Sequence, residues 1–390
     1  MRARSFVLVM PVLLVVQAHA QQPPAQPPGV PPAAINPQPP GDAMLIAQGW
    51  LLLAQGGAVA AADRARQVLA RTPYDPGAAA LAVEAEIIRG GSQGALTEYE
   101  RILGARRHEE PLLLRRVSHA VLREAVAQSA DQRARLTALR ALAANGDDAA
   151  RAELATAMSS GSEPATRLLA ESGNADALKR LADGISARIV DPVSALKSMS
   201  KTRNAPTVTL AIKMLDDPRS EMRGAAIQAL GQMRAKEAVP KLRTLLTDER
   251  PFIRIDAATA LLRMEDETGL PMIQELAVSE SAQARLDAAE ALAPRADAAW
   301  VELVRRLTAA AEPEIRARAA RLIAPHDPQL AETVFNGLQA DPNPAVRTLA
   351  NGAILESSAS FDLRRLRGLM HTASLEQRVL AAERILTATR

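Results

Sequence analysis

One stretch of the chain has the residue types of a nucleophilic serine site. Residues 90–94 read Gly-Gly-Ser-Gln-Gly, which fits the Gly-x-Ser-x-Gly pattern of serine hydrolases. That pattern activates serine only on a strained turn between a strand and a helix, with an oxyanion hole and with an acid and a histidine later in the chain. Here the flanking segments have helical periodicity. We therefore expect Ser92 to belong to a glycine-rich turn between two helices and to have no catalytic role.

Metal and cofactor chemistry is also poorly supported. The chain contains no cysteine, which excludes disulfides, thiolate metal sites and cysteine nucleophiles. Beyond the N-terminal segment the histidines are scattered, and His108-Glu109 is the only His-Glu pair. Phosphate-binding glycine loops, dinucleotide fingerprints and calcium loops do not occur in the sequence. We expect a protein that is not an enzyme and that has no cofactor or bound metal.

The first 20 residues predict export. Arg2 and Arg4 precede an apolar run over residues 6–16, and small residues follow at 18–20. This arrangement is typical of a Sec signal peptide, with cleavage expected after Ala20. The apolar run is too short to span a bilayer, and no later stretch is apolar enough to do so. We expect a periplasmic or secreted protein without stable membrane insertion after signal cleavage. An uncleaved N-terminal anchor is the alternative.

The composition of the mature protein predicts a disordered linker, a helical fold and a partner other than nucleic acid. Residues 21–41 hold nine prolines, which predicts an extended, disordered linker rather than a packed structure. Without Arg2 and Arg4 there are 45 basic residues against 44 acidic ones, so the net charge is close to zero and nucleic acid is not an expected partner. Aromatic residues make up only 2% of the chain, which suits close-packed helices better than sheets.

The second half of the chain repeats itself every 31 residues. An arginine recurs at this interval, at Arg223, Arg254, Arg285, Arg316, Arg347 and Arg378. Three residues after each arginine comes an alanine, at Ala226, Ala257, Ala288, Ala319, Ala350 and Ala381. A branched aliphatic residue follows four positions later, so all three share one helical face. Two further apolar ladders predict a second helix per unit, and helix pairs that cannot bury their apolar stripes alone must stack on one another.

The repeat unit resembles the HEAT-like repeat of the phycobilisome-lyase type. The matching residues are the acidic-proline turn at 216–218, Met222-Arg223, Ala225-Ala226, Leu230-Gly231 and 238–242, which read Ala-Val-Pro-Lys-Leu. The resemblance implies an all-α, right-handed α-solenoid, or superhelix, of stacked helix pairs. It also implies an interaction surface more often than an enzyme. A chromophore lyase is much less favoured, because an exported chain would not meet cytoplasmic phycobiliproteins.

A different period governs the helices that follow the linker. Gly56 and Gly90, and Val68 and Ile102, are each 34 residues apart, which resembles tetratricopeptide repeats over residues 42–107. We assign residues 42–130 to this TPR-like region, 131–215 to degenerate HEAT-like repeats and 216–390 to the regular ones. Because the last unit has only its first helix, we expect residues 374–390 to act as a C-terminal cap with a partly polar exposed face.

An apolar strip marks the inner face of the TPR-like region. In relatives that hold a carboxylate this face carries Lys, Asn and Arg. Here it carries apolar residues, namely Ile46, Trp50, Leu53, Ile87 and Ile88. The strip is either a groove for an apolar or amphipathic peptide or a face covered by the third helix pair, of which we favour the second.

The repeat array offers further candidate contacts. We favour a structural role for the recurring arginine, bonded to acidic or carbonyl groups of the adjacent turn, over a basic stripe for a polyanion. The second helix of each pair is expected to line the concave side. Trp300 replaces a small residue of its siblings, so it either fills a gap or projects toward a ligand. The candidate partner-binding residues of this region are Arg243, Trp300, Arg305, Arg306, Arg364 and Arg367.

These observations favour a non-catalytic scaffold or adaptor that mediates protein–protein interaction in the envelope of a Gram-negative bacterium. The alternative is an accessory or assembly factor that holds a client peptide of an envelope enzyme or complex. Either reading requires protein or peptide partners, and the sequence leaves their identity open.

Overall fold

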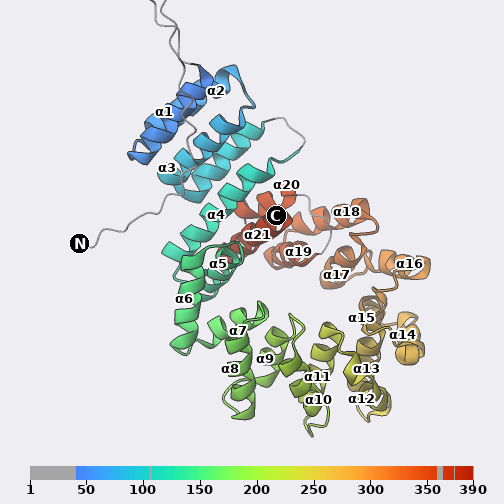
Figure 1. The fold of residues 1–390 in the computed structure, drawn as a ribbon. Helices are drawn as coiled ribbons and strands as arrows, with labels where there is room; N and C mark the ends of the chain where they lie inside the picture. Colours follow the sequence, from blue (N-terminus) through green and yellow to red (C-terminus); the bar gives the residue numbers. More distant parts are fainter. Residues whose placement is uncertain (1–40, 105–107, 358–362, 373, 390) are drawn as a thin grey trace, which may run out of the picture. The chain divides into compact units, whose positions relative to one another are not determined.

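The computed structural model describes residues 41–104, 108–357, 363–372 and 374–389 (Figure 1). The predicted signal peptide and nearly all of the proline-rich linker lie outside this part of the chain. Contacts divide the chain into residues 1–41 and one folded unit, residues 42–390.

The described residues form helices and contain no strand. The helices are α1 (Asp42–Ala54), α2 (Ala58–Arg71), α3 (Pro76–Leu103), α4 (Pro111–Gln128), α5 (Gln132–Ala144), α6 (Asp148–Ser159), α7 (Glu163–Glu171), α8 (Ala175–Ser186), α9 (Pro192–Met199), α10 (Ala205–Met214), α11 (Ser220–Met233), α12 (Val239–Thr244), α13 (Pro251–Arg263), α14 (Leu270–Ala277), α15 (Ala282–Leu292), α16 (Ala298–Leu307), α17 (Pro313–Ile323), α18 (Pro328–Gln339), α19 (Pro344–Glu356), α20 (Leu363–Thr372) and α21 (Leu375–Ala388). Short 3₁₀ turns flank α12 and α14. Not one of these helices is both long enough and apolar enough to span a bilayer.

The helices after α4 form two rows. From α5 to α21 each odd-numbered helix packs against the next odd-numbered one, whereas most even-numbered neighbours are farther apart. Figure 1 shows the odd-numbered helices on the inside of the curve and the even-numbered ones outside. These inner helices are the first members of their pairs. The expectation that second helices line the concave side is therefore wrong, because the first helices carry the small alanines that allow close spacing.

The predicted packing rows form the core of this array. All six alanines of the 31-residue repeat, from Ala226 to Ala381, are fully buried. Among the aliphatic residues four positions later, only Leu292 is half-buried and the others are buried. Removing alanine and leucine surface from water at each joint supplies the favourable free energy that a single helix pair lacks.

The contacts of the recurring arginines confirm their predicted structural role. In five consecutive repeats, the guanidinium donates from Nη1 to the backbone carbonyls six and five residues earlier. These bonds measure 2.6 to 3.3 Å and involve Arg223, Arg254, Arg285, Arg316 and Arg347. The acceptors lie in the turn before each inner helix, where carbonyls lack intrahelical partners. Each arginine thus fixes the angle between one repeat and the next.

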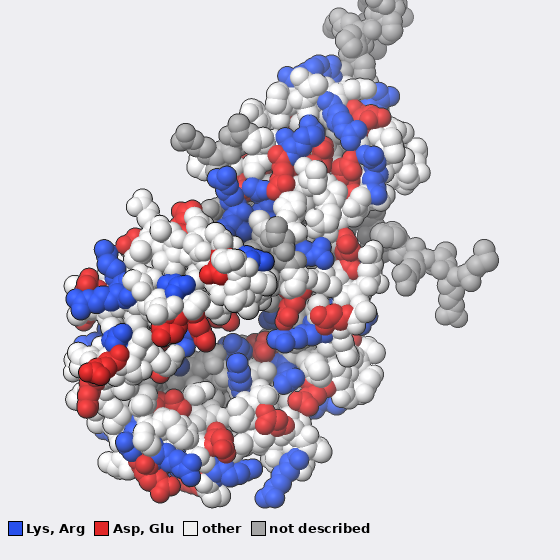
Figure 2. Space-filling model, turned by 180° about the vertical axis from the view of Figure 1, so that it is seen from behind, with Lys and Arg blue, Asp and Glu red and all other residues white. Residues whose placement is uncertain are grey.

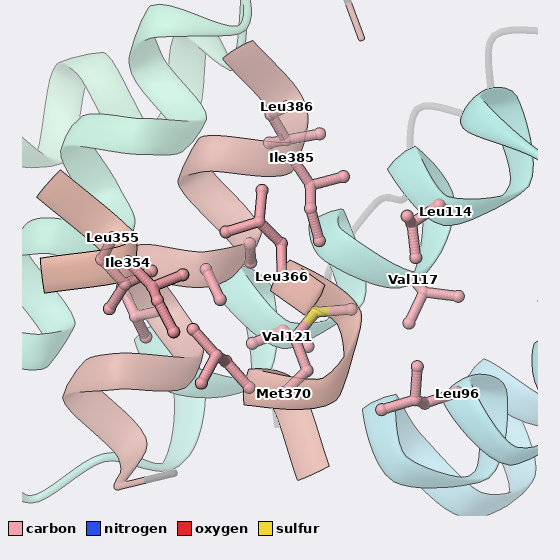
Figure 3. Packing of buried hydrophobic residues seen from close by; sticks show 14 of the residues in the cluster. Leu96, Leu114, Val117, Val121, Ile354, Leu355, Leu366, Met370, Ile385 and Leu386 are labelled. Atoms are coloured by element: carbon pink, nitrogen blue, oxygen red, sulfur yellow. The ribbon is translucent and has the colours of Figure 1, made fainter. Parts of the chain in front are cut away.

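The C-terminal helices close the array on an earlier part of the chain. Helix α21 packs against α4 and α5, and it buries Val379, Ile385 and Leu386. Figure 3 shows side chains of α20 and α21 meeting Leu114, Val117 and Val121 of α4. The expectation of a solvent-facing C-terminal cap is therefore wrong. Its polar residues instead form bonds across the closure, such as Arg140 of α5 with Glu383 of α21 at 2.9 Å.

Candidate partner-binding surfaces

A break in α3 positions the first candidate surface. Gly91 has φ 64° and ψ −156°, so α3 consists of two helices joined at this residue. The second helix begins at Ser92, whose backbone N–H donates to Glu124 Oε2 of α4 at 2.9 Å. A carboxylate at a helix N-terminus satisfies a free N–H group and interacts favourably with the helix dipole. Glu124 therefore ties the break in α3 to the C-terminal part of α4.

The Gly-x-Ser-x-Gly stretch lies in this break, on a helix-to-helix turn as expected from the sequence. The Ser92 side chain is buried, and its backbone contact is a carboxylate. The strand that a nucleophile elbow requires is missing from this part of the described chain.

The apolar strip on α1 and α3 is only partly covered. Trp50 is 37% exposed and Ile88 is 59% exposed. Ile46, Leu53 and Ile87 are half-buried against the core. The third helix pair, α4 and α5, thus leaves part of the strip open, contrary to the interpretation favoured from the sequence.

A polar groove continues from the strip along α3 and α4. Its volume is about 490 Å³. The lining residues come from one face of each helix and include Glu84, Ile87, Arg116, His119, Arg123 and Glu124. Arg116 and Glu84 form an ion pair across the groove at 2.5 Å. Sequence analysis missed the four residues on α4, although Arg116, His119 and Arg123 are spaced three and four positions apart and so share one helical face.

His119 is the unusual member of the groove. Its Nδ1 atom is buried and has no hydrogen-bond partner within the described structure. Burial, followed by the positive charges of Arg123 and Arg115, lowers the pKa of His119 below its ordinary value. Neutral imidazole is thereby favoured at physiological pH, and its unpartnered Nδ1 atom is enclosed by the protein.

The predicted residues of the outer helices form ion pairs. Arg243 of α12 contacts Asp266 at 3.1 Å, and Arg305 of α16 contacts Asp327 at 3.2 Å, each joining one repeat to the next. Arg306 pairs with Glu302 of its own helix at 2.9 Å. Arg364 is exposed on α20. These residues lie on the convex side and are too dispersed to form one site.

Two predicted partner-binding residues require correction. Trp300 is only 3% exposed, its Nε1–H donates to the Ala289 carbonyl at 2.7 Å, and its ring packs edge-on against His326. It is packed into the core and does not project toward a ligand. The Arg367 side chain is 13% exposed, because its guanidinium lies between Glu100 and Glu109 in the closure. Its charge fastens α20 to the N-terminal helices and is not presented to a partner.

The inner row carries a nearly continuous belt of polar contacts. Successive inner helices are joined by pairs such as Arg318–Glu290 at 2.7 Å and Arg321–Glu356 at 2.7 Å. Among the described residues the belt has no such pair between α13 and α15. Burial raises the pKa of Asp256 on α13 and of Asp287 on α15, and the charge of Asp287 raises the pKa of Asp256 further. Because the described charges here are mostly engaged with one another, the belt joins successive repeats.

Comparisons with known proteins agree with the helical-repeat architecture. Residues 208–293 match the family model of HEAT repeats. The complex of CpcE and CpcF of phycocyanin lyase from Nostoc sp. PCC7120 is similar, with 17% identity over 73% of this chain and 97% of that chain and a TM-score of 0.38. An engineered protein matches with 18% identity over 88% of this chain and 99% of its own, at a TM-score of 0.27. No curated protein sequence matches. The TPR-like resemblance of the N-terminal helices remains a prediction. The described residues thus form an all-helical α-solenoid, and residues 208–293 match HEAT repeats.

Proposed function

We propose that this protein is a non-catalytic scaffold or adaptor that binds protein partners in the bacterial cell envelope. The observation that carries the proposal is the open strip and groove on α1, α3 and α4. Elsewhere the inner surface is bridged by its own side chains, and the C-terminal helices are used for closure. A repeat scaffold that keeps a surface of this kind open has the architecture of a protein that holds another protein.

The chemistry of this surface favours a polypeptide ligand. Trp50 and Ile88 offer apolar contacts, and the adjoining groove offers both charge signs beside a half-buried imidazole. Protein interfaces combine aromatic anchors with polar rims in this way. Figure 2 shows basic and acidic side chains interspersed over one face of the molecule, which favours a protein partner over a polyanion such as nucleic acid.

Partner binding can be tested with matched variants. The purified chain is used as bait in an envelope extract, alongside Ile88→Glu and the control Ile189→Glu, which places the same charge on another exposed isoleucine. We expect at least one protein to be retained by the original chain and the control and depleted about tenfold or more by Ile88→Glu. Equal recovery by all three baits, or by none, would contradict the assignment of the surface.

Envelope localisation needs a separate test. The chain is expressed with its own N-terminus in a Gram-negative host, and the mature protein is sequenced from the periplasmic fraction. We expect a first residue of Gln21. Retention in the cytoplasm with Met1 or Arg2 at the N-terminus would rule out export.

The groove also favours the second candidate, an accessory factor that holds a client peptide. Its length along two helices suits an extended segment better than a folded surface. Peptides derived from the depleted partner discriminate the two functions. Binding of a short peptide with the affinity of the whole partner supports the accessory role, whereas binding that requires the folded partner supports the scaffold.

A further inference from the structure

Helix α1 presents an apolar face to solvent. Met44 and Leu51 are 56% and 60% exposed, and Ala43, Ala47 and Ala54 beside them are exposed as well. Only Gln48 and Gln55 contribute polar groups to this face. The single charged residue of α1, Asp42, is bonded to Arg71 at 2.6 Å and so lies toward α2. The face is distinct from the strip, which it meets at Trp50.

The apolar face is unusual because α1 is the first helix of the folded unit. A terminal helix of a repeat array needs a polar outer face, because no further unit covers it. Surface helices normally confine apolar residues to one stripe, but α1 has them on both its buried and exposed sides. Its exposed face therefore has the character of an interface.

The other end of the array restricts what can cover α1. Head-to-tail stacking of copies would need a complementary free end, but α21 is already packed against α4 and α5 of its own chain. With one open end per molecule, self-association must use the same surface on both copies. Such an isologous contact closes after two copies and cannot grow into a filament.

We propose that α1 packs against α1 of a second copy in a two-fold symmetric dimer. The face suits itself, because two uncharged surfaces bring no like charges together. Ala43, Ala47 and Ala54, at spacings of four and seven residues, also leave room for Met44 and Leu51 of the other copy. A helix of 13 residues is about 20 Å long, so the contact lies below the usual interface size and the dimer dissociates in the micromolar range.

Sedimentation equilibrium of the full chain between about 1 and 200 µM tests the dimer. The original chain is expected to shift from one to two copies, and Leu51→Glu to remain a monomer with an unchanged melting temperature. Val278→Glu is the control, because Val278 is 82% exposed in another part of the array, and it should dimerise normally. All variants keep the same N-terminal segment, so differences between them report on α1.

A cysteine cross-link identifies the face in contact. The chain has no cysteine, so Gln48→Cys introduces a single thiol on the exposed side of α1. A short bis-maleimide should give a covalent dimer, and adding Leu51→Glu should abolish it. A monomer at every concentration, growth beyond two copies, or loss of the dimer in Val278→Glu would each overturn the proposal. Partner capture through Ile88 is tested independently, so failure of one proposal is distinguishable from failure of the other.

Discussion

The recurring arginines show that one repeat position can hold the same charged residue because it makes the same contacts in successive repeats. In five consecutive repeats the guanidinium reaches two carbonyls of the preceding turn. Sequence spacing predicted this role because a residue fixed in register with core positions must point in the same direction in every unit. The acceptors were also predicted as acidic or carbonyl groups of the adjacent turn, and Arg223 uses both kinds. The exact pair of carbonyls could not be predicted, because it depends on the shape of each turn.

Replacing one such arginine should loosen one joint. Arg285 donates to the carbonyls of Ser279 and Glu280 at 2.7 and 2.8 Å, so Arg285→Met should lower the free energy of unfolding by about 1–3 kcal/mol. Arg306→Met is the control, because Arg306 is largely exposed and pairs only within its helix, and it should cost less than about 0.5 kcal/mol. Urea unfolding followed by circular dichroism measures both. Equal effects would show that the carbonyl contacts contribute little.

Asp256 should make stability depend on pH in an identifiable direction. Burial raises the pKa of Asp256, so its favourable contribution is complete below the unfolded-state pKa and is lost as pH rises through the folded-state pKa. Asp256→Asn should therefore be more stable than the original chain at pH 7, and the difference should vanish near pH 4.

Asp217→Asn provides the opposite sign. The hydrogen bond from Arg219 lowers the pKa of Asp217, so this variant should be the less stable protein at pH 7. The urea midpoints of both variants and of the original chain are compared at pH 4 and pH 7. A shift in the same direction for both variants would contradict the role assigned to burial of Asp256.

At the scale of elements, helix pairing was predictable and the surface between helices was not. The turn around Gly91 follows from its glycines and from the 34-residue spacing. The groove beside it depends on which face of α4 approaches α3, and long-range packing decides that. Trp50 illustrates the same limit, because periodicity placed it on an inner face without showing whether α4 and α5 would cover it.

The break in α3 should depend on a single glycine. Gly91 has a positive φ, and a Cβ atom there would lie 3.0 Å from Glu124 Oε2. Gly91→Ala should destabilise the protein by about 1–2 kcal/mol, because an L-residue is strained at this φ and the carboxylate must move. Gly90→Ala should cost nothing, since the nearest atom to its Cβ would be 3.9 Å away. Thermal unfolding of the two variants compares them, and an equal loss would indicate that α3 tolerates a continuous helix.

The whole molecule shows what a repeat sequence conceals. Translation by 31 residues predicts how each unit packs on the next, yet closure depends on small rotations summed over many joints. The residues that complete the closure, such as Leu386 and Glu383, have a sequence pattern that fits a terminal cap equally well. Closure also explains why Arg367, at an outer-helix position in the repeat, is enclosed by two carboxylates.

Closure predicts proximity between residues far apart in sequence. Arg133 of α5 and Glu376 of α21 form an ion pair at 3.1 Å, and both side chains are accessible. In the cysteine-free chain, Arg133→Cys with Glu376→Cys should cross-link within one molecule through a short bis-maleimide, as a monomer whose mass includes a single doubly attached linker. Arg133→Cys with Val278→Cys is the control pair and should gain two singly attached linkers.

Adding Leu386→Asp places a charge in the buried contact between α21 and α4. It should therefore abolish the first cross-link and expand the molecule in small-angle X-ray scattering. Linkers attached singly at both sites of the first pair would mean that the array stays open in solution, and Glu383 and Arg367 would then be available to a partner after all.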